Sequence, residues 1–581
     1  MTNNKNKLNN KYVSVFGLIL FSAILILPFF KIEQIGVHSD WSFHAARVQQ
    51  IYLNLKRGSL FTFIGTDTFH NIGNGNFLFY PTLFLYPWAL LQFILKPIEA
   101  YLAYIWLLFI VTLLVSYFCM ISYNKKNNLQ AIFFAIIYTI APYHLYLTLQ
   151  NYVLGEAQAY AFLPLVLLGI YKLLYRNEYL TLAVGTSLVA YCHYVSLFIT
   201  GEVLIAIVII YLLVQKNNFN RILFSLIKAI LIFVLLTLWQ FIPLLTDCWR
   251  QNLFTPKGGF LVILSINDFI THSMSNEVTN LGGLGILLIL TAFFGWAWTK
   301  VDSIDYTIWL FGILSALLIT NVFPHSLFKN TIFNIIQFTY RYSDFAICFL
   351  SIICAKGLVK YCKLTTNIKS LKIIAFILCF ILLYSSSIIP ILERNANHNN
   401  SIETLSHPAK KYQTLRSNDD TPIILNNKNY NYQFSYGALY GETDYFPNAS
   451  FINQASILNH IAYINKKEKK ISPTPTSKAN TLIYNLNLKY NANLDLPIIV
   501  FKHTSLKVDN KPYTYQLSKR GTLKINLKKG KHTIAISYTP PIIYYLFIGI
   551  SLSTWIILLL LYVFKKYITI STSRKWYVST P

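Results

Sequence analysis

The sequence predicts an all-α polytopic membrane protein with a small β-rich domain toward its C-terminal end. Three observations lead to this fold class. First, 55% of the 581 residues are hydrophobic, only 12% are charged, and the mean hydropathy is +0.46. Second, the chain contains many apolar runs of about 20 residues, the length at which a helix crosses a bilayer. Third, one long polar segment, residues 393–541, interrupts these runs.

The apolar runs predict about 12–13 transmembrane helices in a lipid bilayer. Three lysines in residues 1–11 place the N-terminal end in the cytoplasm, because basic residues are retained inside. The first run, residues 12–30, lacks a small-residue cleavage site, so we expect it to be a retained span. Residues 77–95 are apolar but broken by Pro81 and Pro87, which indicates a juxtamembrane or re-entrant segment. The other expected spans are residues 100–122, 129–149, 157–175, 178–197, 201–215, 222–245, 281–299, 305–323, 342–361, 372–392 and 542–564.

This pattern divides the chain into three parts. Residues 1–392 form the transmembrane domain, with a first outer loop at 31–76. Residues 393–541 form an extracytoplasmic β-rich domain, in which residues 481–538 alternate between apolar and polar with a period of two. All seven cysteines lie in or beside apolar runs, so we expect no disulfide in this domain. Residues 542–581 form the final transmembrane helix and a basic cytoplasmic tail.

The composition also excludes several classes of function. The formal charge is +27, but its basic residues lie in short connections and on the polar domain, without the interleaved aromatic stripe typical of nucleic-acid binding. We therefore expect no nucleic-acid partner. The sequence contains no Walker loop, dinucleotide-binding glycine turn, HExxH or CxxC motif, so we predict no cofactor. A divalent metal is unsupported, since Asp-x-Asp is absent near Asp40.

The main catalytic candidate follows the first apolar run. Residues 41–55 carry apolar side chains at steps of three and four, which predicts an amphipathic helix. Asp40, His44 and Arg47 follow the same steps on another side, so a carboxylate, an imidazole and a guanidinium should share one face. Asp is also a preferred helix N-cap, and that role is compatible with catalysis. An ionisable trio at the membrane surface is by default a functional hypothesis.

Two further candidate patches fall on the expected outer side. Glu156 opens a helix, where the helix dipole alone also favours an acid. Tyr340 and Arg341 precede an apolar span, where an arginine either snorkels toward the interface or binds a phosphate in bidentate fashion. One or two acids among several basic groups suit a substrate with a phosphate and a lipid tail. They leave a carboxylate to activate an acceptor hydroxyl.

Several stretches, taken in order, resemble a known family. The N-terminal span, the early outer-loop Asp and the outer C-terminal domain are similar to the GT-C superfamily of membrane glycosyltransferases. More closely, the chain resembles the bacterial YfhO-like membrane proteins and relatives described as 6-pyruvoyl-tetrahydropterin synthase-related membrane proteins. Nothing in the sequence resembles a soluble zinc pterin enzyme. The stretches that carry the resemblance are residues 40–47, 156–169, 337–341, 441–447 and 496–538.

The resemblance implies an inverting membrane glycosyltransferase of the bacterial cytoplasmic membrane, with its site facing outside. It would move a sugar from a polyprenyl-phosphate donor to an envelope glycan acceptor, such as teichoic or lipoteichoic acid. Other proteins, a donor-lipid-loading glycosyltransferase and a flippase, would supply the donor. The resemblance implies that Asp40 activates or orients the acceptor and that Arg341 holds the donor phosphate. We expect Arg47 to assist Arg341, and His44, Glu156 and Tyr340 to line the substrate cavity. The family's Gln-Phe-Pro-Trp-Arg pattern reads Gln-Phe-Thr-Tyr-Arg at 337–341, so only the Pro and Trp are replaced.

Two other functions remain open from the sequence. A lipid-linked-sugar flippase or polysaccharide exporter would need ionisable residues deep inside its spans. The apolar runs contain few such residues, with Glu202 the clearest exception, which favours chemistry at the surface. A non-enzymatic envelope scaffold that binds through the β-rich domain predicts that an Asp40→Asn substitution has no effect.

Overall fold

The structure is a computed structural model of the chain. It describes all residues except 1, 125–126, 216–217, 249–251, 255–257, 302, 364–368, 397–413, 415–422, 471–473 and 576–581. The expected boundary at residue 392 falls inside helix α16 (Lys369–Ala396). Most of residues 397–422 and the end of the expected cytoplasmic tail lie outside the described residues.

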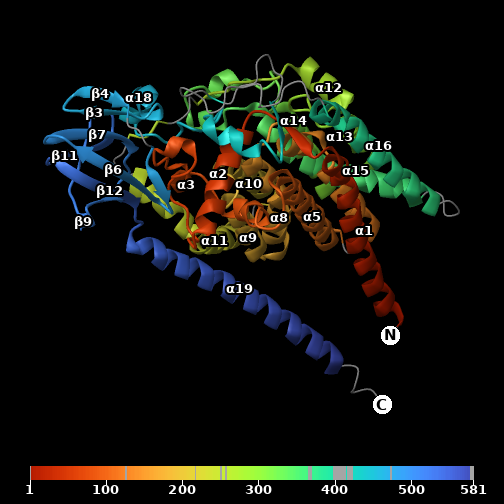
Figure 1. The fold of residues 1–581 in the computed structure, drawn as a ribbon. Coiled ribbons are helices and arrows are strands. Elements are labelled where there is room, and N and C mark those ends of the chain that lie inside the picture. The colour runs from red at the N-terminus through yellow and green to blue at the C-terminus, as the bar shows by residue number, and fades with distance from the viewer. Residues whose placement is uncertain are drawn as a thin grey trace.

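Long apolar helices form most of the molecule (Figure 1). Among the described residues, eight helices are long and apolar enough to cross a membrane, and a pair bent by 49° adds a ninth crossing if it counts as one span. The helices that contain the eight are α1 (Thr2–Ile32), α5 (Pro97–Tyr123), α8 (Leu154–Arg176), α10 (Tyr194–Val214), α11 (Phe219–Cys248), α15 (Ser343–Lys363), α16 and α19 (Ile542–Lys575). The bent pair joins α6 (Asn128–Thr139) to Pro142–Gln150, which begins with α7 (Pro142–Leu145).

Three expected spans are shorter than a bilayer requires. They correspond to α9 (Leu180–Ala190), to Ile286–Trp298 with α13 (Ile286–Phe294), and to α14 (Ile304–Leu317). Each has fewer than the roughly 20 residues that a straight crossing needs. The predicted fold class is confirmed, with eight or nine full-length crossings in the described residues where the sequence predicts 12–13. The three short helices account for the difference between twelve and nine, and the interrupted segment at 77–95 is the thirteenth.

The segment at 77–95 is not among the candidate spans. It folds as α3 (Asn76–Phe79), a 3-10 turn at Leu83–Leu85, and α4 (Tyr86–Leu91). Proline lacks the backbone N–H that a helix interior needs, which explains why Pro81 falls between helices and Pro87 at the start of one. The expectation of a segment that does not cross as a continuous helix agrees with this arrangement.

Residues 461–538, called the β module below, form a sandwich of two five-stranded sheets. The strand orders are β10-β11-β7-β3-β4 and β5-β6-β12-β8-β9. Apolar side chains from both sheets, such as Leu494 and Ile534, form one buried core between them, which explains the period-two pattern. The strands are β3 (Ile461–Ile464), β4 (Lys467–Lys470), β5 (Thr476–Lys478), β6 (Thr481–Leu488), β7 (Ala492–Ile499), β8 (Thr504–Val508), β9 (Lys511–Pro512), β10 (Gln516–Leu517), β11 (Thr522–Leu527) and β12 (Gly530–Tyr538).

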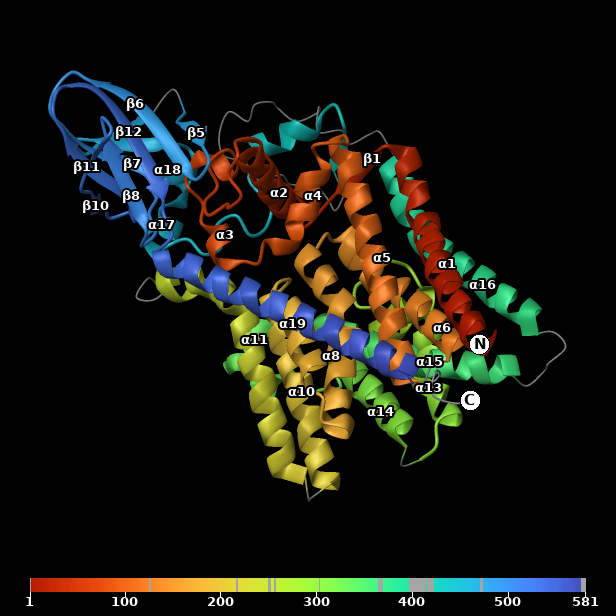
Figure 2. The ribbon, with the colours of Figure 1, turned by 90° about the horizontal axis from the view of Figure 1, so that it is seen from below.

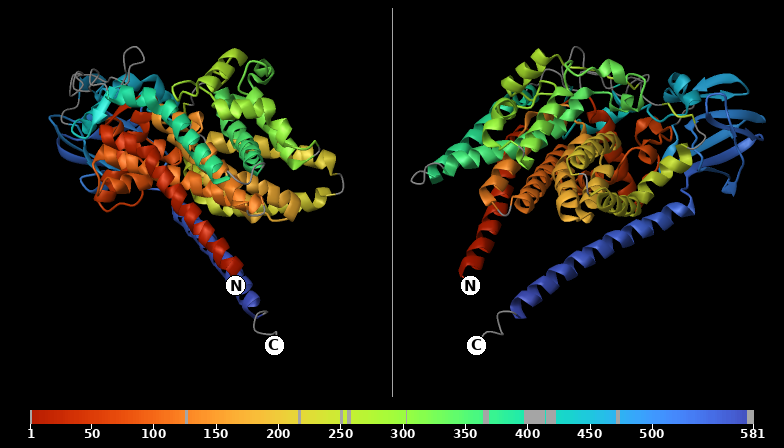
Figure 3. Two further views of the ribbon diagram at one scale, coloured as in Figure 1. Left: turned by 90° about the vertical axis from the view of Figure 1, so that its right-hand side faces the viewer. Right: turned by 180° about the vertical axis from the view of Figure 1, so that it is seen from behind.

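The first loop and the polar segment are joined to each other. Strand β1 (Gln34–Val37) pairs antiparallel with β2 (Ile423–Asn426) in a separate two-stranded sheet. The β module lies beside α2 (Trp41–Lys56) and α3 (Figures 1 and 2). Helix α19 leaves the module, packs against α11 and then diverges from the other helices (Figure 1). The remaining short helices are α12 (Ile266–Ser275), α17 (Asn448–Ile452) and α18 (Gln454–Leu458). The N-terminal end of α1 and the C-terminal end of α19 lie close together on one side of the molecule (Figure 3).

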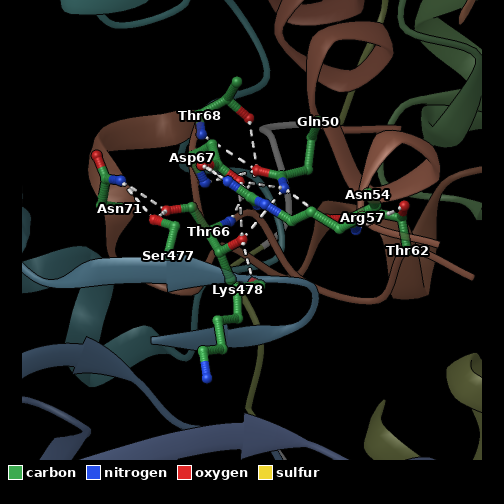
Figure 4. Close-up of polar contacts among 10 residues, drawn as sticks. All are labelled: Gln50, Asn54, Arg57, Thr62, Thr66, Asp67, Thr68, Asn71, Ser477 and Lys478. Atoms are coloured by element: carbon green, nitrogen blue, oxygen red, sulfur yellow. Dashed lines mark hydrogen bonds and ion pairs between the residues drawn. The ribbon is translucent and has the colours of Figure 1, made fainter. Parts of the chain in front are cut away.

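A buried amide fixes the loop between α2 and α3. The Gln50 Oε1 atom, on α2, accepts hydrogen bonds from the backbone N–H groups of Thr66, Asp67 and Thr68 at 2.8, 2.7 and 3.1 Å (Figure 4). Arg57, one residue past the end of α2, forms two short contacts with Asp67, at 2.5 and 2.7 Å. The loop is therefore held to α2 by both backbone and charged contacts.

The same loop holds the edge of the β module. Ser477 on β5 donates a 2.5 Å hydrogen bond to the Thr66 carbonyl, and the Thr66 hydroxyl donates to the Lys478 carbonyl at 3.0 Å (Figure 4). Asn71 donates to the Thr66 carbonyl and to the Ser477 hydroxyl. Through the loop, strand β5 has a fixed position relative to α2 and to the residue that precedes it, Asp40.

Candidate functional site

Asp40 occupies the N-cap position of α2, but its carboxylate does not cap the helix. Ser39, at a positive φ of 48°, donates a weak 3.4 Å hydrogen bond to the Asp40 carboxylate. The residue is half-buried. The capping interpretation is therefore wrong for the side chain, and the carboxylate remains available for another partner.

The surroundings of Asp40 shift the pKa of its carboxyl group toward neutral pH. Burial raises the pKa of Asp40 to about 7, although the Arg341 guanidinium and the Ser39 hydroxyl favour the charged form. The negative charges of Asp444 and Glu156 raise the pKa further. A carboxylate that titrates near neutrality can accept a proton and later release it, as a general base does.

Arg341 and Glu156 form a buried ion pair. Arg341 Nε donates to Glu156 Oε2 at 3.2 Å, and the two residues are 8% and 1% exposed. Arg341 Nη1 also donates to the Ile336 carbonyl at 2.7 Å, and the Tyr143 hydroxyl donates to Glu156 Oε1 at 2.5 Å. The arginine points into the protein, so the snorkelling interpretation is wrong. Glu156 is bound by a specific partner and does not merely complement the dipole of α8.

Three of the sequence patches meet at this point. Glu156 lies in the first turn of α8, and Arg341 lies in the 3-10 turn Thr339–Tyr342 directly before α15. Tyr340 is buried beside them, with its ring centroid 6.1 Å from that of Tyr143. Electrostatic coupling joins Asp40 to both Glu156 and Arg341. Asp40, Glu156, Tyr340 and Arg341 therefore form one group, called the outer polar cluster below.

Two members of this region have no assigned role in the sequence analysis. The charge of Asp444 acts on Asp40, and burial raises the pKa of Asp444 itself to about 6. Asp444 lies in a segment that packs on α2. The Leu439 N–H donates to the Ser42 hydroxyl, and Gly441 lies against the Phe43 ring. In the sequence, Asp444 stands out only as part of 441–447, one of the stretches that resemble the family. That resemblance does not show that Asp444 lies near Asp40.

The other such residue is Tyr80. Its hydroxyl lies against Gly155, where an added Cβ would stand 2.5 Å from the Tyr80 oxygen. The Tyr80 ring contacts the Arg47 guanidinium, and the charges of Asp40, Arg341 and Glu156 also act on Tyr80. It therefore interacts with both the outer polar cluster and a second group on α2.

His44 and Arg47 form this second group and are fully buried, at 1% and 0% exposed. Arg47 Nη2 donates to the carbonyls of Tyr80 and Pro81 at 3.0 and 2.7 Å, and its guanidinium lies 4.8 Å from the centre of the Tyr80 ring. Burial lowers the pKa of Arg47 to about 10. Burial, with the positive charge of Arg47, lowers the pKa of His44 well below its usual value. The trio expected on one face is thus divided, since Asp40 couples to Arg341 and Arg47 is held by carbonyls.

A cavity of about 650 Å³ adjoins this second group, and we call it the apolar cavity. It lies between residues 60–86 and the helices α9, α10, α11 and α19. Its lining includes Tyr80, whose ring and carbonyl also contact Arg47. The volume falls within the range of about 300–1,000 Å³ for small-molecule sites. Other lining residues are mostly apolar and aromatic: Phe61, Phe63, Phe77, Tyr86, Tyr194, Trp239, Tyr544 and Trp555.

The described residues contain no group of three or more His, Cys, Asp and Glu side chains that could hold a metal ion. The acids of the outer polar cluster are instead balanced by Arg341. Any charged ligand that enters there meets one guanidinium and several carboxyl groups.

The helices and the cavity among them define a multi-pass membrane protein. Residues 77–390 match a family described as "6-pyruvoyl-tetrahydropterin synthase related domain; membrane protein", and the chain belongs to this family. The match confirms the resemblance to these membrane proteins. It includes Glu156, Tyr340 and Arg341 but begins after Asp40 and ends before the β module.

The other comparisons are more distant. No curated protein sequence matches the chain. Among solved structures, the chain is similar to a crystal structure of ArnT from Cupriavidus metallidurans bound to undecaprenyl phosphate. The similarity covers 73% of this chain and 86% of ArnT, with 12% sequence identity and a TM-score of 0.39. A similarity at this level carries no weight for the function.

Proposed function

We propose that the protein is a GT-C-type membrane glycosyltransferase that moves a sugar from a polyprenyl-phosphate donor to an envelope glycan. The observation that carries the proposal is that the Arg341 charge acts on Asp40, while Tyr80, which contacts Arg47 and lies against Gly155 beside Glu156, also lines the apolar cavity. A proton acceptor, a cationic site and an apolar cavity are the parts that a lipid-phosphate sugar donor requires. The orientation in the bacterial cytoplasmic membrane, with the site outside, is part of the proposal.

The donor would bind across Tyr80. Its prenyl tail would occupy the apolar cavity, where the helices α10, α11 and α19 keep it at membrane depth. Its phosphate would meet the guanidinium groups of Arg341 and Arg47. Arg341 uses Nε and Nη1 for its partners among the described residues, while its Nη2 donates to none of them. That nitrogen can donate to a phosphate oxygen without breaking the pair with Glu156.

Asp40 would accept the proton of the acceptor hydroxyl as the acceptor oxygen bonds to the anomeric carbon. The bond from that carbon to the phosphate oxygen breaks, and polyprenyl phosphate leaves with the electron pair. Arg341 stabilises the charge that develops on this leaving phosphate. Glu156 holds the guanidinium in place, and Tyr340 and His44 shape the surrounding space. A single displacement of this kind inverts the configuration at the sugar.

A flippase or exporter has less support. The buried acids of the candidate spans are Glu156 and Asp344, each in the first turn of its helix, and Asp247, in the last turn of α11. Glu202, which is half-buried and lies nine residues into α10, accepts a hydrogen bond from Tyr342, adjacent to Arg341. A transport path needs polar groups along the depth of the bilayer.

The test is the envelope glycan composition of a deletion strain that carries wild type or Asp40→Asn. We expect one sugar substituent to disappear on deletion, and only wild type to restore it. Asp509→Asn is a matched control, because it makes the same change at an exposed turn of the β module. If Asp40→Asn restores the substituent fully at equal protein level, the catalytic assignment is wrong and the scaffold or transport functions gain support.

A further inference from the structure

The β module carries a polar cavity that the proposed reaction does not use. Its volume is about 350 Å³, near the lower end for small-ligand sites. It lies where β7, β10 and β11 meet the connection between β9 and β10. We call it the module cavity, and it is lined by Asn493, Tyr513, Thr514, Tyr515, Gln516, Lys524, Ile525 and Asn526.

Two tyrosines are held at the rim of the module cavity. Residues 513–515 cross from one sheet of the sandwich to the other. The Tyr513 hydroxyl donates to the Asn526 carbonyl at 2.5 Å, and the Tyr515 hydroxyl donates to the Thr504 carbonyl at 3.0 Å. Tyr513 nevertheless stays 39% exposed. A fixed, exposed ring can receive an apolar face of a ligand at little entropic cost.

The remaining lining supplies hydrogen-bonding groups. On β11, Ile525 faces the core, so Lys524 and Asn526 face outward. Lys524 pairs with Gln516 on β10 and with Asp495 on β7. Asn526 pairs with Asn493 on β7. The side chains of Gln516 and Lys524 form no hydrogen bond with any described residue, and so remain available to a ligand.

The module is also strongly basic. Residues 461–541 contain 15 Lys or Arg residues against three acidic ones. Two of the three acids are already engaged, Asp495 with Arg520 and Asp509 with His532, each at 2.8 Å. A surface with such an excess of positive charge attracts anionic partners.

We propose that the module cavity binds an anionic polysaccharide. The exposed Tyr513 ring would pack on the apolar face of a sugar ring, and Lys524 would bind its acidic group. The Gln516 amide would bond the sugar hydroxyls, together with the groups that Asn493 and Asn526 do not use in their own 2.5 Å hydrogen bond. An anionic lipid surface would need the charge but no cavity lined by tyrosines and amides. Strands β10 and β11 lie on the side of the module away from the helices, so this site is separate from Asp40 (Figures 1 and 2).

The fixed position of the β module would hold a bound polysaccharide near the proposed catalytic site. Because the Gln50 loop holds β5 to α2, a polymer bound to the module is held at a constant distance from Asp40 (Figure 4). Identification of this polymer with the acceptor depends on the proposed function. The binding itself does not.

The test uses the full-length protein in phosphatidylcholine nanodiscs, with fluorescently labelled oligogalacturonate as the probe and anisotropy as the readout. Neutral dextran of equal length and polyphosphate are compared as competitors. We expect oligogalacturonate to bind, both competitors to be at least about tenfold weaker, and the Gln516→Ala/Lys524→Gln variant to weaken binding about tenfold. Lys531→Gln removes one charge at an exposed site in the other sheet and is the matched control.

Several results would overturn the proposal. They are absence of binding, equal competition by polyphosphate, and equal loss of binding in the Lys531→Gln control. Competition by phosphatidylglycerol vesicles with no effect of the Gln516→Ala/Lys524→Gln variant would assign the charge to a lipid surface. Asp40→Asn should bind the probe as wild type does, so that failure of this proposal and failure of the proposed reaction are distinguished.

Discussion

The pair between Arg341 and Glu156 permits a quantitative prediction. Glu156→Gln preserves the shape and the hydrogen-bond acceptor but removes the charge that balances a buried guanidinium. Loss of one partner of a buried ion pair costs about 3–5 kcal/mol. Asp344 is also buried and electrostatically coupled to Arg341, so it retains part of the compensation. We therefore expect the free energy of unfolding to fall by about 3 kcal/mol, the lower end of that range.

The assay is equilibrium unfolding of the purified protein in mixed micelles, followed by tryptophan fluorescence. Glu178→Gln is the control, because Glu178 is exposed and lies 3.8 Å from Lys172 at the surface. That change should cost no more than about 1 kcal/mol. The double variant Glu156→Gln/Arg341→Gln should be less destabilised than the sum of its single variants, as expected for coupled neighbours. If Glu156→Gln unfolds within about 0.5 kcal/mol of wild type, the buried pair does not have the assigned role.

Three more predictions follow from the same region. Because Asp40 acts in its deprotonated form, kcat/KM should rise with pH through about 7 and then level off. Asp444→Asn removes a negative charge that raises the pKa of Asp40, so the pH profile should move to lower pH. An unmoved profile would contradict the electrostatic interaction between Asp444 and Asp40. Gly155→Ala places a Cβ 2.5 Å from the Tyr80 hydroxyl oxygen and 3.1 Å from the Cys192 carbonyl oxygen. This substitution should lower the free energy of unfolding by about 1–3 kcal/mol. The control Gly201→Ala has open space around its Cβ and should not destabilise the protein. Gln50→Ala leaves three backbone N–H groups without their acceptor, so limited proteolysis at residues 62–71 should accelerate; unchanged cleavage would show that the loop does not depend on Gln50.

The sequence alone was sufficient for the parts of the fold that depend on local pattern. Apolar runs predicted the spans, and period-two alternation predicted the strands of the β module, because burial of one face requires that spacing. The apolar runs predict full crossings where the structure has the short helices α9, α14 and Ile286–Trp298, because an apolar run does not reveal where a helix ends. Pro81 and Pro87 correctly indicated an interrupted segment.

The candidate site depended on contacts that no local pattern contains. Glu156 and Arg341 are 185 residues apart, and the sequence treated each as a lone charge with a local explanation. The charge of Asp444 acts on Asp40 from a segment that packs on α2 through Leu439 and Gly441. Helix periodicity placed Arg47 on the face of Asp40, but the carbonyls of Tyr80 and Pro81 hold its guanidinium elsewhere.

The most direct test of the account is sugar transfer by the purified protein. Wild type and Asp40→Asn, each in nanodiscs, would receive labelled polyprenyl-phosphate sugars extracted from membranes and envelope glycan from the deletion strain. Loss of a general base lowers a rate by about 10²–10⁴-fold. The account predicts label transfer to the glycan by wild type, and a loss of that size in Asp40→Asn without loss of donor binding. Equal transfer by the two proteins, or no transfer by wild type, would contradict it.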